Sequence, residues 1–300
     1  MKKTSLLVAL IFLSCFAYAQ KSNFEGTKKI NGAGLYFNVR GTGEYLLVIH
    51  GGPGLNHAYF IPHLNQLEKK FTIIYYDQRA CGKSSIPTSD SISIKFLVND
   101  IESIRKEFKT EKINILAHSW GAVLATHYAL AYPEKINKLV MSNSGMFSHE
   151  YDQEVLALMQ KKSTKEDSLA RAKILSKGNL DARDYEKIFL STFELSAYDK
   201  ANVKKIDLKL PDNFAIASNA LFTGLSKDPA MNANLYDSLS ALKIPVLIIN
   251  GQSDLVPPNA LRRLREKLPQ AKLEVFKKSG HFPFVEETGL YNDRVIAFLK

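Results

Sequence analysis

The sequence is poor in cysteine, with only two among 300 residues. Cys15 lies in an N-terminal segment that has the features of a leader, so its removal would leave Cys81 alone. A single remaining thiol excludes an intramolecular disulfide. An exported chain without disulfides needs a core that is stable by itself. The 45% hydrophobic content over this length predicts a core of that size.

Two further absences concern partners. Beyond the leader, no apolar run is long enough to cross a bilayer as a helix. The formal net charge is +10 at pH 7, but the basic residues are scattered, often beside acids, as in Glu68-Lys69-Lys70. No arginine-rich run alternates with aromatic residues, which argues against a nucleic-acid partner. We therefore expect a solvated basic surface, and the sequence favours no particular oligomeric state.

Residues 1–19 have the features of a secretory signal peptide. Two lysines precede an apolar run at 6–13, and Ala17-Tyr18-Ala19 supplies small residues where signal peptidase reads. We expect cleavage after this triplet, and hence a periplasmic or secreted protein. The alternative is a lipoprotein anchored through acylated Cys15, although Phe12 fits that motif poorly.

Beyond the leader, short apolar runs alternate with helical patterns, which predicts an α/β fold with a mostly parallel sheet flanked by helices. The predicted strands cover residues 45–49, 71–76, 113–116 and 139–141. Helical patterns fall between them, at 58–69, 94–108 and 122–132. Before the first of these strands, segments 27–30 and 35–39 flank the turn Asn31-Gly32-Ala33-Gly34 and predict a β-hairpin.

The alternation stops near residue 146. Helical patterns follow without a strand until residue 244, and the sheet then resumes with strands at 245–249 and 273–276. We interpret residues 20–145 and 242–300 as one core. Residues 146–241 are then a helical cap, or lid, inserted over the edge of the sheet where ligands bind.

The stretch around Ser119 joins a predicted strand directly to a predicted helix. Ala117-His118-Ser119-Trp120-Gly121 has a small residue two positions before and after the serine. That spacing is typical of a nucleophile elbow, a tight turn that exposes the serine hydroxyl above the sheet. The simpler interpretation is a serine that caps a helix, so other motifs must decide.

A glycine-rich turn, His50-Gly51-Gly52-Pro53-Gly54, follows the strand at 45–49. Backbone amides in such a turn can approach a substrate closely and stabilise an oxyanion. We assign the amides of Gly52 and Trp120 as oxyanion donors and Gly51 as a substrate-binding residue. The alternative is a plain glycine turn.

Two more residues follow the last predicted strands. Asp254 lies after the strand at 245–249, and His281 lies after the strand at 273–276. An aspartate can orient an imidazole and stabilise its protonated form. Alternatively, Asp254 caps the next helix and His281 is an ordinary buried or surface histidine.

The loop after the strand at 71–76 contains Asp77-Gln78-Arg79 and no obvious catalyst, so we predict a local Asp77–Arg79 ion pair.

Together these motifs resemble the α/β-hydrolase superfamily, and more narrowly the proline iminopeptidase branch of serine aminopeptidases. The resemblance covers roughly residues 27–144 and 242–300. It rests on His50-Gly-Gly-Pro-Gly54, on Asp77-Gln-Arg-x-x-Gly82-x-Ser84, on His118-Ser-Trp-Gly121 and on the chain order Ser119, Asp254, His281. It implies a catalytic triad of those three residues. It also implies release of an N-terminal residue, often proline, from short peptides through an acyl-enzyme, without a cofactor or metal.

The resemblance is weaker in the cap. The family binds the substrate's ammonium with acids from this insert, commonly near tryptophans, and Trp120 is the only tryptophan here. Of the acids available, we favour Glu194, beside Phe193, as a substrate-binding residue; a solvated glutamate is the alternative. The remaining candidates are Glu186, Asp199 and Asp212.

Two other functions compete with the aminopeptidase. The first is a carboxylesterase or lactonase that hydrolyses small acyl compounds with the same triad. The second is a non-catalytic binding protein on the same scaffold, which the intact set of Ser119, Asp254 and His281 disfavours.

Overall fold

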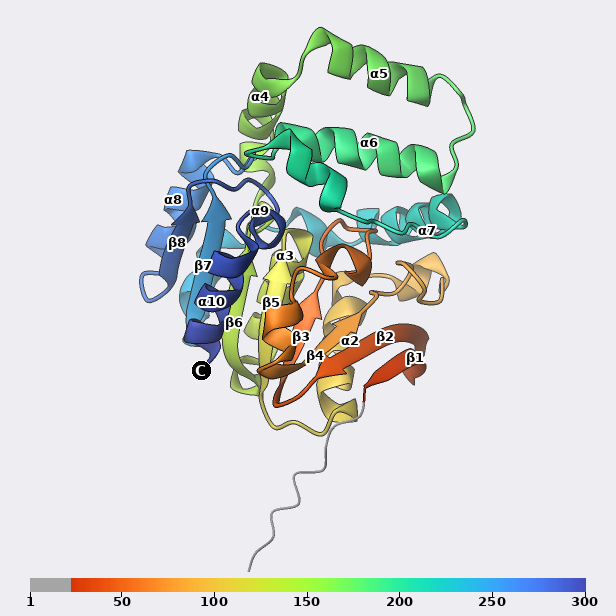
Figure 1. Cartoon of the computed structure of the whole chain (residues 1–300). Coiled ribbons are helices and arrows are strands. Elements are labelled where there is room, and N and C mark those ends of the chain that lie inside the picture. Colours follow the sequence, from red (N-terminus) through yellow and green to blue (C-terminus); the bar gives the residue numbers. More distant parts are fainter. Residues whose placement is uncertain (1–22) are drawn as a thin grey trace, which may run out of the picture.

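The computed structural model describes residues 23–300, so the predicted signal peptide and Cys15 lie outside it. Within the described chain, the strands form one eight-stranded sheet in the order β1-β2-β4-β3-β5-β6-β7-β8 (Figure 1). The strands are β1 (Phe24–Ile30), β2 (Ala33–Gly41), β3 (Glu44–Ile49), β4 (Phe71–Tyr76), β5 (Ile113–His118), β6 (Ile136–Ser142), β7 (Val246–Gly251) and β8 (Lys272–Phe276). The six strands β3 to β8 pair in parallel with one another, which confirms the predicted α/β class.

The predicted N-terminal hairpin is present, with a tighter turn than expected. β1 and β2 are antiparallel, and β2 also pairs antiparallel with β4. Only Asn31 and Gly32 form the turn, with φ angles of 45° and 81°, while Ala33 and Gly34 already belong to β2. Two consecutive residues with positive φ match the right-handed twist of a hairpin, and Asn-Gly is the dipeptide best suited to them.

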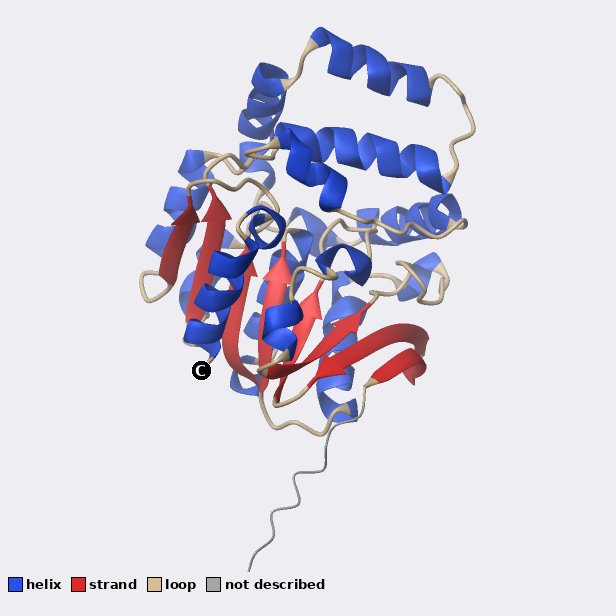
Figure 2. Ribbon diagram, viewed as in Figure 1, coloured by secondary structure: helices blue, strands red, loops and turns tan. Residues whose placement is uncertain are grey.

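Helices cover both faces of the sheet, which explains why its strands are apolar on both sides (Figure 2). Along β3, Leu46 and Val48 belong to one of the two buried hydrophobic clusters, and Leu47 and Ile49 belong to the other. Side chains alternate along a strand, so these successive residues enter opposite layers of the core. The core helices are α1 (Asn65–Glu68), α2 (Ile94–Glu107), α3 (Trp120–Ala131), α8 (Pro258–Lys267), α9 (Pro283–Glu286) and α10 (Thr288–Leu299).

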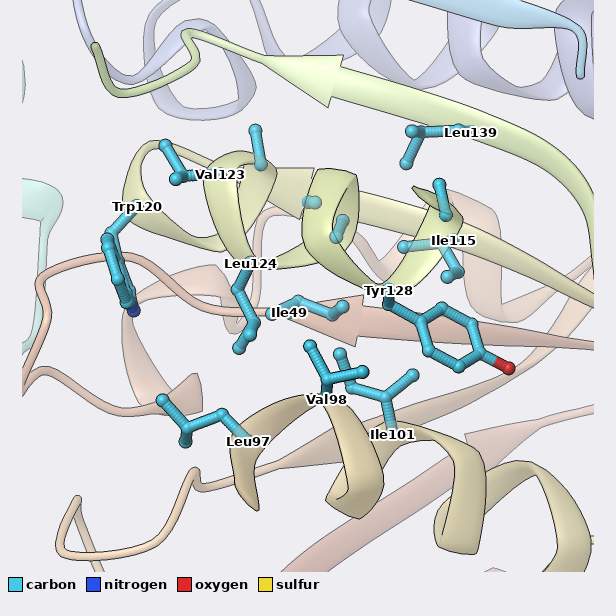
Figure 3. Packing of buried hydrophobic residues seen from close by; sticks show 14 of the residues in the cluster. Ile49, Leu97, Val98, Ile101, Ile115, Trp120, Val123, Leu124, Tyr128 and Leu139 are labelled. Atoms are coloured by element: carbon cyan, nitrogen blue, oxygen red, sulfur yellow. The ribbon is translucent and has the colours of Figure 1, made fainter. Parts of the chain in front are cut away.

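The central helix α3 is buried around nearly its whole circumference. Figure 3 shows Leu124 of α3 directed toward Ile49 of β3 and toward Val98 of α2. Each such side chain contributes about 1.5–3 kcal/mol by leaving water. The helix that follows Ser119 is therefore fixed by packing on several sides.

The segment between β6 and β7 is helical, as predicted. Figure 1 shows its long helices beyond the arrowheads of the central strands, over the edge where the parallel strands end. The long helices are α4 (Asp152–Lys162), α5 (Lys165–Leu175), α6 (Ala182–Leu195) and α7 (Phe214–Ser226). The short 3-10 helices in the same segment are η4 (His149–Tyr151), η5 (Lys200–Lys205), η6 (Pro229–Asn232) and η7 (Tyr236–Ala241). We keep the name cap for residues 146–241.

The predicted helix at 58–69 is wrong. The structure has η1 (His57–Phe60) and then, after several turns, the short α1. Pro62 lacks an amide hydrogen and disfavours helical geometry at Ile61, which is extended at φ −95° and ψ 127°. The proline therefore ends the first helical turn.

Two other 3-10 turns lie in the core, η2 (Ser89–Ser91) and η3 (Pro133–Lys135). Among the described residues, none of the helices is both long and apolar enough to cross a bilayer.

The close contact between α3 and β3 yields a testable prediction. A Cβ on Gly121 would lie 2.4 Å from the carbonyl oxygen of Ile49, so Gly121→Ala must push two backbones apart. We expect it to lower the free energy of unfolding by about 1–3 kcal/mol. Gly289→Ala in α10 is the matched control, because nothing lies within 4 Å of its added Cβ. Chemical denaturation should show the control unchanged or up to about 1 kcal/mol more stable, and equal losses in both variants would contradict the argument.

Candidate active site

Ser119 occupies a strained turn between β5 and α3. Its φ of 55° and ψ of −126° lie in a region that residues with a side chain seldom adopt. The turn is held by its backbone: Ser119 N–H donates to Ser142 O at 3.0 Å, and Ser119 O accepts from the amides of Ala122 and Gly145 at 2.9 Å each. The Ser119 side chain makes no capping hydrogen bond to α3. Of the two interpretations, the structure has the elbow geometry and not the helix cap.

Gly51 lies directly against the elbow. A Cβ on Gly51 would stand 2.9 Å from Cβ of Ser119 and 3.2 Å from the carbonyl oxygen of His118. Any larger residue would displace the serine. The glycine-rich turn after β3 therefore lies in contact with Ser119, and both line the same cavity.

The structure brings Ser119, His281 and Asp254 into one hydrogen-bonded chain. His281 Nε2 lies 3.1 Å from Ser119 Oγ, and His281 Nδ1 lies 3.0 Å from each carboxylate oxygen of Asp254. The three residues follow β5, β7 and β8, whose ends meet at one edge of the sheet. In this geometry an imidazole can take a proton from the serine while the aspartate holds its opposite nitrogen.

Asp254 is set up as a buried, charged hydrogen-bond acceptor. Its side chain is only 2% exposed. Burial alone would raise the pKa of Asp254, but the facing His281 and hydrogen bonds from Asn143 and from the Leu255 amide hold that pKa below its ordinary value. The carboxylate therefore stays ionised beside the imidazole. Its side chain does not serve as the cap of α8.

Asn143 belongs to this site, and the sequence analysis missed it. Its Nδ2 donates to Asp254 Oδ2 at 2.7 Å and to the Gly280 carbonyl oxygen at 2.9 Å, so it joins the aspartate loop to the histidine loop. Asn143 has a φ of 45° and directly follows β6. A polar residue after a buried strand was the available signal, and asparagine tolerates this backbone conformation better than most residues.

The two predicted oxyanion donors both lie near Ser119. Trp120 is the first residue of α3, and amides in the first turn of a helix have no intrahelical acceptor. Gly52 is exposed and has a φ of 120°, which only glycine adopts easily. Gly52 and Ser119 line one cavity, and Trp120 follows Ser119 directly in the chain. Their role in binding an oxyanion stays a prediction.

The predicted ion pair between Asp77 and Arg79 is wrong. Arg79 instead makes a bidentate pair with Asp100 of α2, at 2.7 Å and 2.5 Å, and both side chains are about 1% exposed. Asp77 accepts from the amide of His57 at 2.9 Å and faces its imidazole at 2.7 Å. Adjacent side chains in this loop diverge, so proximity in sequence did not give proximity in space.

Gln78 connects two of the loops that form the site. Its side-chain amide donates to the His50 carbonyl oxygen at 2.8 Å, and its Oε1 accepts from the indole Nε1 of Trp120 at 3.3 Å. The loop after β4 thereby connects the start of the glycine-rich turn to the residue after Ser119. Burial lowers the pKa of His50 to about 4, so this histidine is neutral.

A second buried chain links the glycine-rich turn to the histidine loop through Tyr59 and His118. Gly51 N–H donates to the Tyr59 hydroxyl at 2.6 Å, which lies 2.9 Å from His118 Nδ1. His118 Nε2 lies 2.8 Å from the His281 carbonyl oxygen. Burial lowers the pKa of His118 to about 3, so the ring is neutral. Because the neutral His118 ring carries one hydrogen, the donors can be assigned: the Tyr59 hydroxyl donates to Nδ1, and Nε2–H donates to the His281 carbonyl oxygen.

A cavity of about 280 Å³ opens above Ser119 and His281. Its other walls are the glycine-rich turn and a group of apolar residues from the core and the cap. The apolar lining consists of Pro53, Leu55, Phe189, Phe193, Phe214, Phe222 and Phe282. Glu194, the predicted ammonium partner, is half-buried in α6 but does not line this cavity. Within residues 23–300, no cluster of three or more histidine, cysteine, aspartate or glutamate side chains is arranged to hold a metal ion.

Comparison with known proteins agrees with this geometry. Residues 44–288 match the family described as the alpha/beta hydrolase fold. The chain belongs to the α/β-hydrolase family. A proline iminopeptidase of Lactobacillus delbrueckii subsp. bulgaricus is 31% identical over 264 residues, which cover 83% of this chain and 87% of that protein. This relative supports the narrower resemblance to the proline iminopeptidase branch.

Solved structures of the family share the fold. A proline iminopeptidase of Mycobacterium smegmatis superposes with a TM-score of 0.68 at 21% identity, covering 92% of this chain and 97% of that one. An esterase of Exiguobacterium antarcticum also gives 0.68, at 20% identity, covering 92% and 99%. Peptidase and esterase therefore match this fold equally well, and overall shape does not separate the two chemistries.

The Tyr59 hydroxyl joins Gly51 to His118, so we predict that its removal lowers stability and turnover. Tyr59→Phe leaves the Gly51 amide and His118 Nδ1 buried without their partner, so we expect about 1–3 kcal/mol less stability and slower turnover. Tyr76→Phe is the matched control, because the buried Tyr76 hydroxyl has no hydrogen-bond partner among the described residues. Denaturation and steady-state rates of both variants check this, and similar losses in the two would refute a bridging role.

The neutral histidines of the site predict acid sensitivity. In the unfolded chain, His50 and His118 take up protons near pH 6.5, but in the folded protein only near pH 4 and 3. Between about pH 6.5 and 4 the unfolded state therefore binds more protons, and stability falls as the pH falls. The maximal slope is about 1.4 kcal/mol per pH unit for each histidine. Denaturation midpoints of His118→Gln should depend less on pH. His149→Gln should retain or steepen the slope, because the hydrogen bond to Asp152 raises the pKa of the exposed His149.

Proposed function

We propose that the protein is a serine hydrolase that works through an acyl-enzyme on Ser119. The observation that carries the proposal is the hydrogen-bonded chain from Asp254 through His281 to Ser119, with links of 3.0 Å and 3.1 Å. Ser119 and His281 line the cavity, and the buried Asp254 faces the opposite nitrogen of His281. A nucleophile, a base and an orienting acid in this arrangement are the requirements for acyl transfer.

The reaction proceeds in two halves. His281 Nε2 accepts the proton of Ser119 Oγ as the oxygen attacks the acyl carbon, and Asp254 stabilises the imidazolium that forms. The amides of Gly52 and Trp120 donate to the oxyanion. The imidazolium then protonates the leaving group, which departs. A water molecule, deprotonated by His281, attacks the acyl-enzyme and releases the acid.

Similarity to curated relatives favours an aminopeptidase that releases an N-terminal residue from short peptides. The relative from Lactobacillus delbrueckii is a proline iminopeptidase, and the similarity spans most of both chains. The glycine-rich turn, the elbow with Trp120 and the Asp77-Gln78-Arg79 loop all belong to the matched region.

A second candidate, hydrolysis of small esters or lactones, is supported by the cavity itself. The apolar lining from Pro53 to Phe282 supplies no carboxylate to an amino group. An ester or lactone with an uncharged acyl group needs only the nucleophile, the oxyanion donors and apolar walls.

Covalent labelling tests the proposed function directly. A fluorophosphonate probe should label wild-type Ser119, and Ser119→Ala should lose both the label and hydrolysis of prolyl-2-naphthylamide or 4-nitrophenyl esters, by at least about a thousandfold. Ser226→Ala, on the exposed end of α7, is the matched control and should keep both. Retained hydrolysis in Ser119→Ala would disprove the nucleophile, and a wild type that takes no label would favour a binding protein.

A further inference from the structure

The walls of the cavity above Ser119 are aromatic and come from both parts of the chain. The cap contributes Phe189 and Phe193 of α6 and also Phe214 and Phe222 of α7, while Phe282 follows His281 in the core. The rings contact one another: Phe193 and Phe282 lie 4.7 Å apart edge to face, and Phe189 and Phe214 lie 5.9 Å apart in the same manner. Four of the five rings are thus held in place by contacts with one another, whereas Phe222 is 48% exposed.

An ammonium group bound between these rings would find neither an opposite charge nor a hydrogen-bond acceptor on them. A charged group that leaves water needs an opposite charge or hydrogen-bond acceptors, or binding becomes unfavourable. Phenylalanine faces attract cations weakly, but they offer no acceptor to the N–H donors of an aminoacyl group. The carboxylate nearest the reaction, Asp254, already faces His281 on both oxygens and is 2% exposed.

The four cap acids named from the sequence have other positions or partners. Glu186 accepts from the Leu210 amide at 2.8 Å and pairs with Arg183 at 2.6 Å. Asp199 accepts from the Ala201 amide at 2.9 Å and so caps η5. Asp212 is exposed to solvent, and neither it nor Glu194 lines the cavity. All four candidates named from the sequence are therefore absent from the lining.

We infer that the acyl pocket of this protein takes an uncharged apolar acyl group and discriminates against a free ammonium on the acyl side of the scissile bond. The inference rests on the proposed serine hydrolase function. The five phenylalanines favour a ring or a short branched chain. The substrates are then esters, lactones or amides of small apolar acids, and N-terminal aminoacyl groups are poor substrates.

Four compounds test this inference at pH 7. Cyclopentanecarbonyl and L-prolyl groups have nearly the same shape, and the prolyl ring differs by carrying a charged nitrogen. Each is offered as a 2-naphthyl ester and as a 2-naphthylamide, so that charge and leaving group are varied separately. For either leaving group, we expect kcat/KM to be at least about a hundredfold higher for the cyclopentanecarbonyl compound. The difference should shrink above about pH 8, where the α-amino group loses its proton.

A designed carboxylate provides a gain-of-function test. Phe222 lines the cavity yet is 48% exposed, so its replacement has little effect on packing. Phe222→Glu should raise the ratio of prolyl to cyclopentanecarbonyl kcat/KM by about tenfold relative to Phe222→Gln, which has the same length without the charge. Circular dichroism and fluorophosphonate labelling establish that both variants are folded and have an active serine.

The outcomes separate failure of the inference from failure of the proposed function. If the wild type takes no fluorophosphonate label, the proposed function fails. If it takes the label but prefers the prolyl compounds, or cleaves neither acyl group, the inference about the pocket is overturned. A Glu194→Gln variant whose loss is confined to the prolyl compounds would overturn it too, because that result assigns the ammonium to Glu194.

Discussion

The site depends on one strained residue, Ser119, held between β5 and α3. A serine at φ 55° and ψ −126° costs about 1–3 kcal/mol of conformational energy, which the surrounding packing must offset. Gly121 allows α3 to approach the Ile49 carbonyl, and Gly51 allows the next turn to approach the serine. Without these two contacts the hydroxyl would not be held beside the imidazole. The buried α3 and the flanking strands thus act as a rigid support for one side chain.

Electrostatics divide the histidines of the site into two roles. His50 and His118 are buried and neutral, and each makes fixed hydrogen bonds, so they hold the loops of the site in place and do not transfer protons. His281 is partly exposed and faces an ionised Asp254, which fits the general base of the proposed reaction. The polar atoms around Ser119 are therefore specialised, and the neutral ones join loops that are distant in sequence.

The cap and the core meet in the cavity and at the histidine loop. The amide of His281 donates to the Ser196 carbonyl oxygen at 2.9 Å, at the end of α6. Phe193, one turn earlier, packs against Phe282. The helix that supplies the aromatic wall therefore also fixes the backbone of His281.

The α/β class, the hairpin, most helices and the three residues of the hydrogen-bonded chain could all be predicted from the amino-acid sequence. Those features have local signals, because side-chain alternation, turn dipeptides and loops at strand ends follow from neighbouring residues. The sequence did not determine the partner of Arg79, the bridge through Tyr59 and His118, or the place of Asn143. These depend on which loops the sheet order brings together. The lining of the cavity follows from the packing of the cap on the core, since residues from α6, α7 and the loop after β8 form one aromatic wall without sharing any sequence pattern.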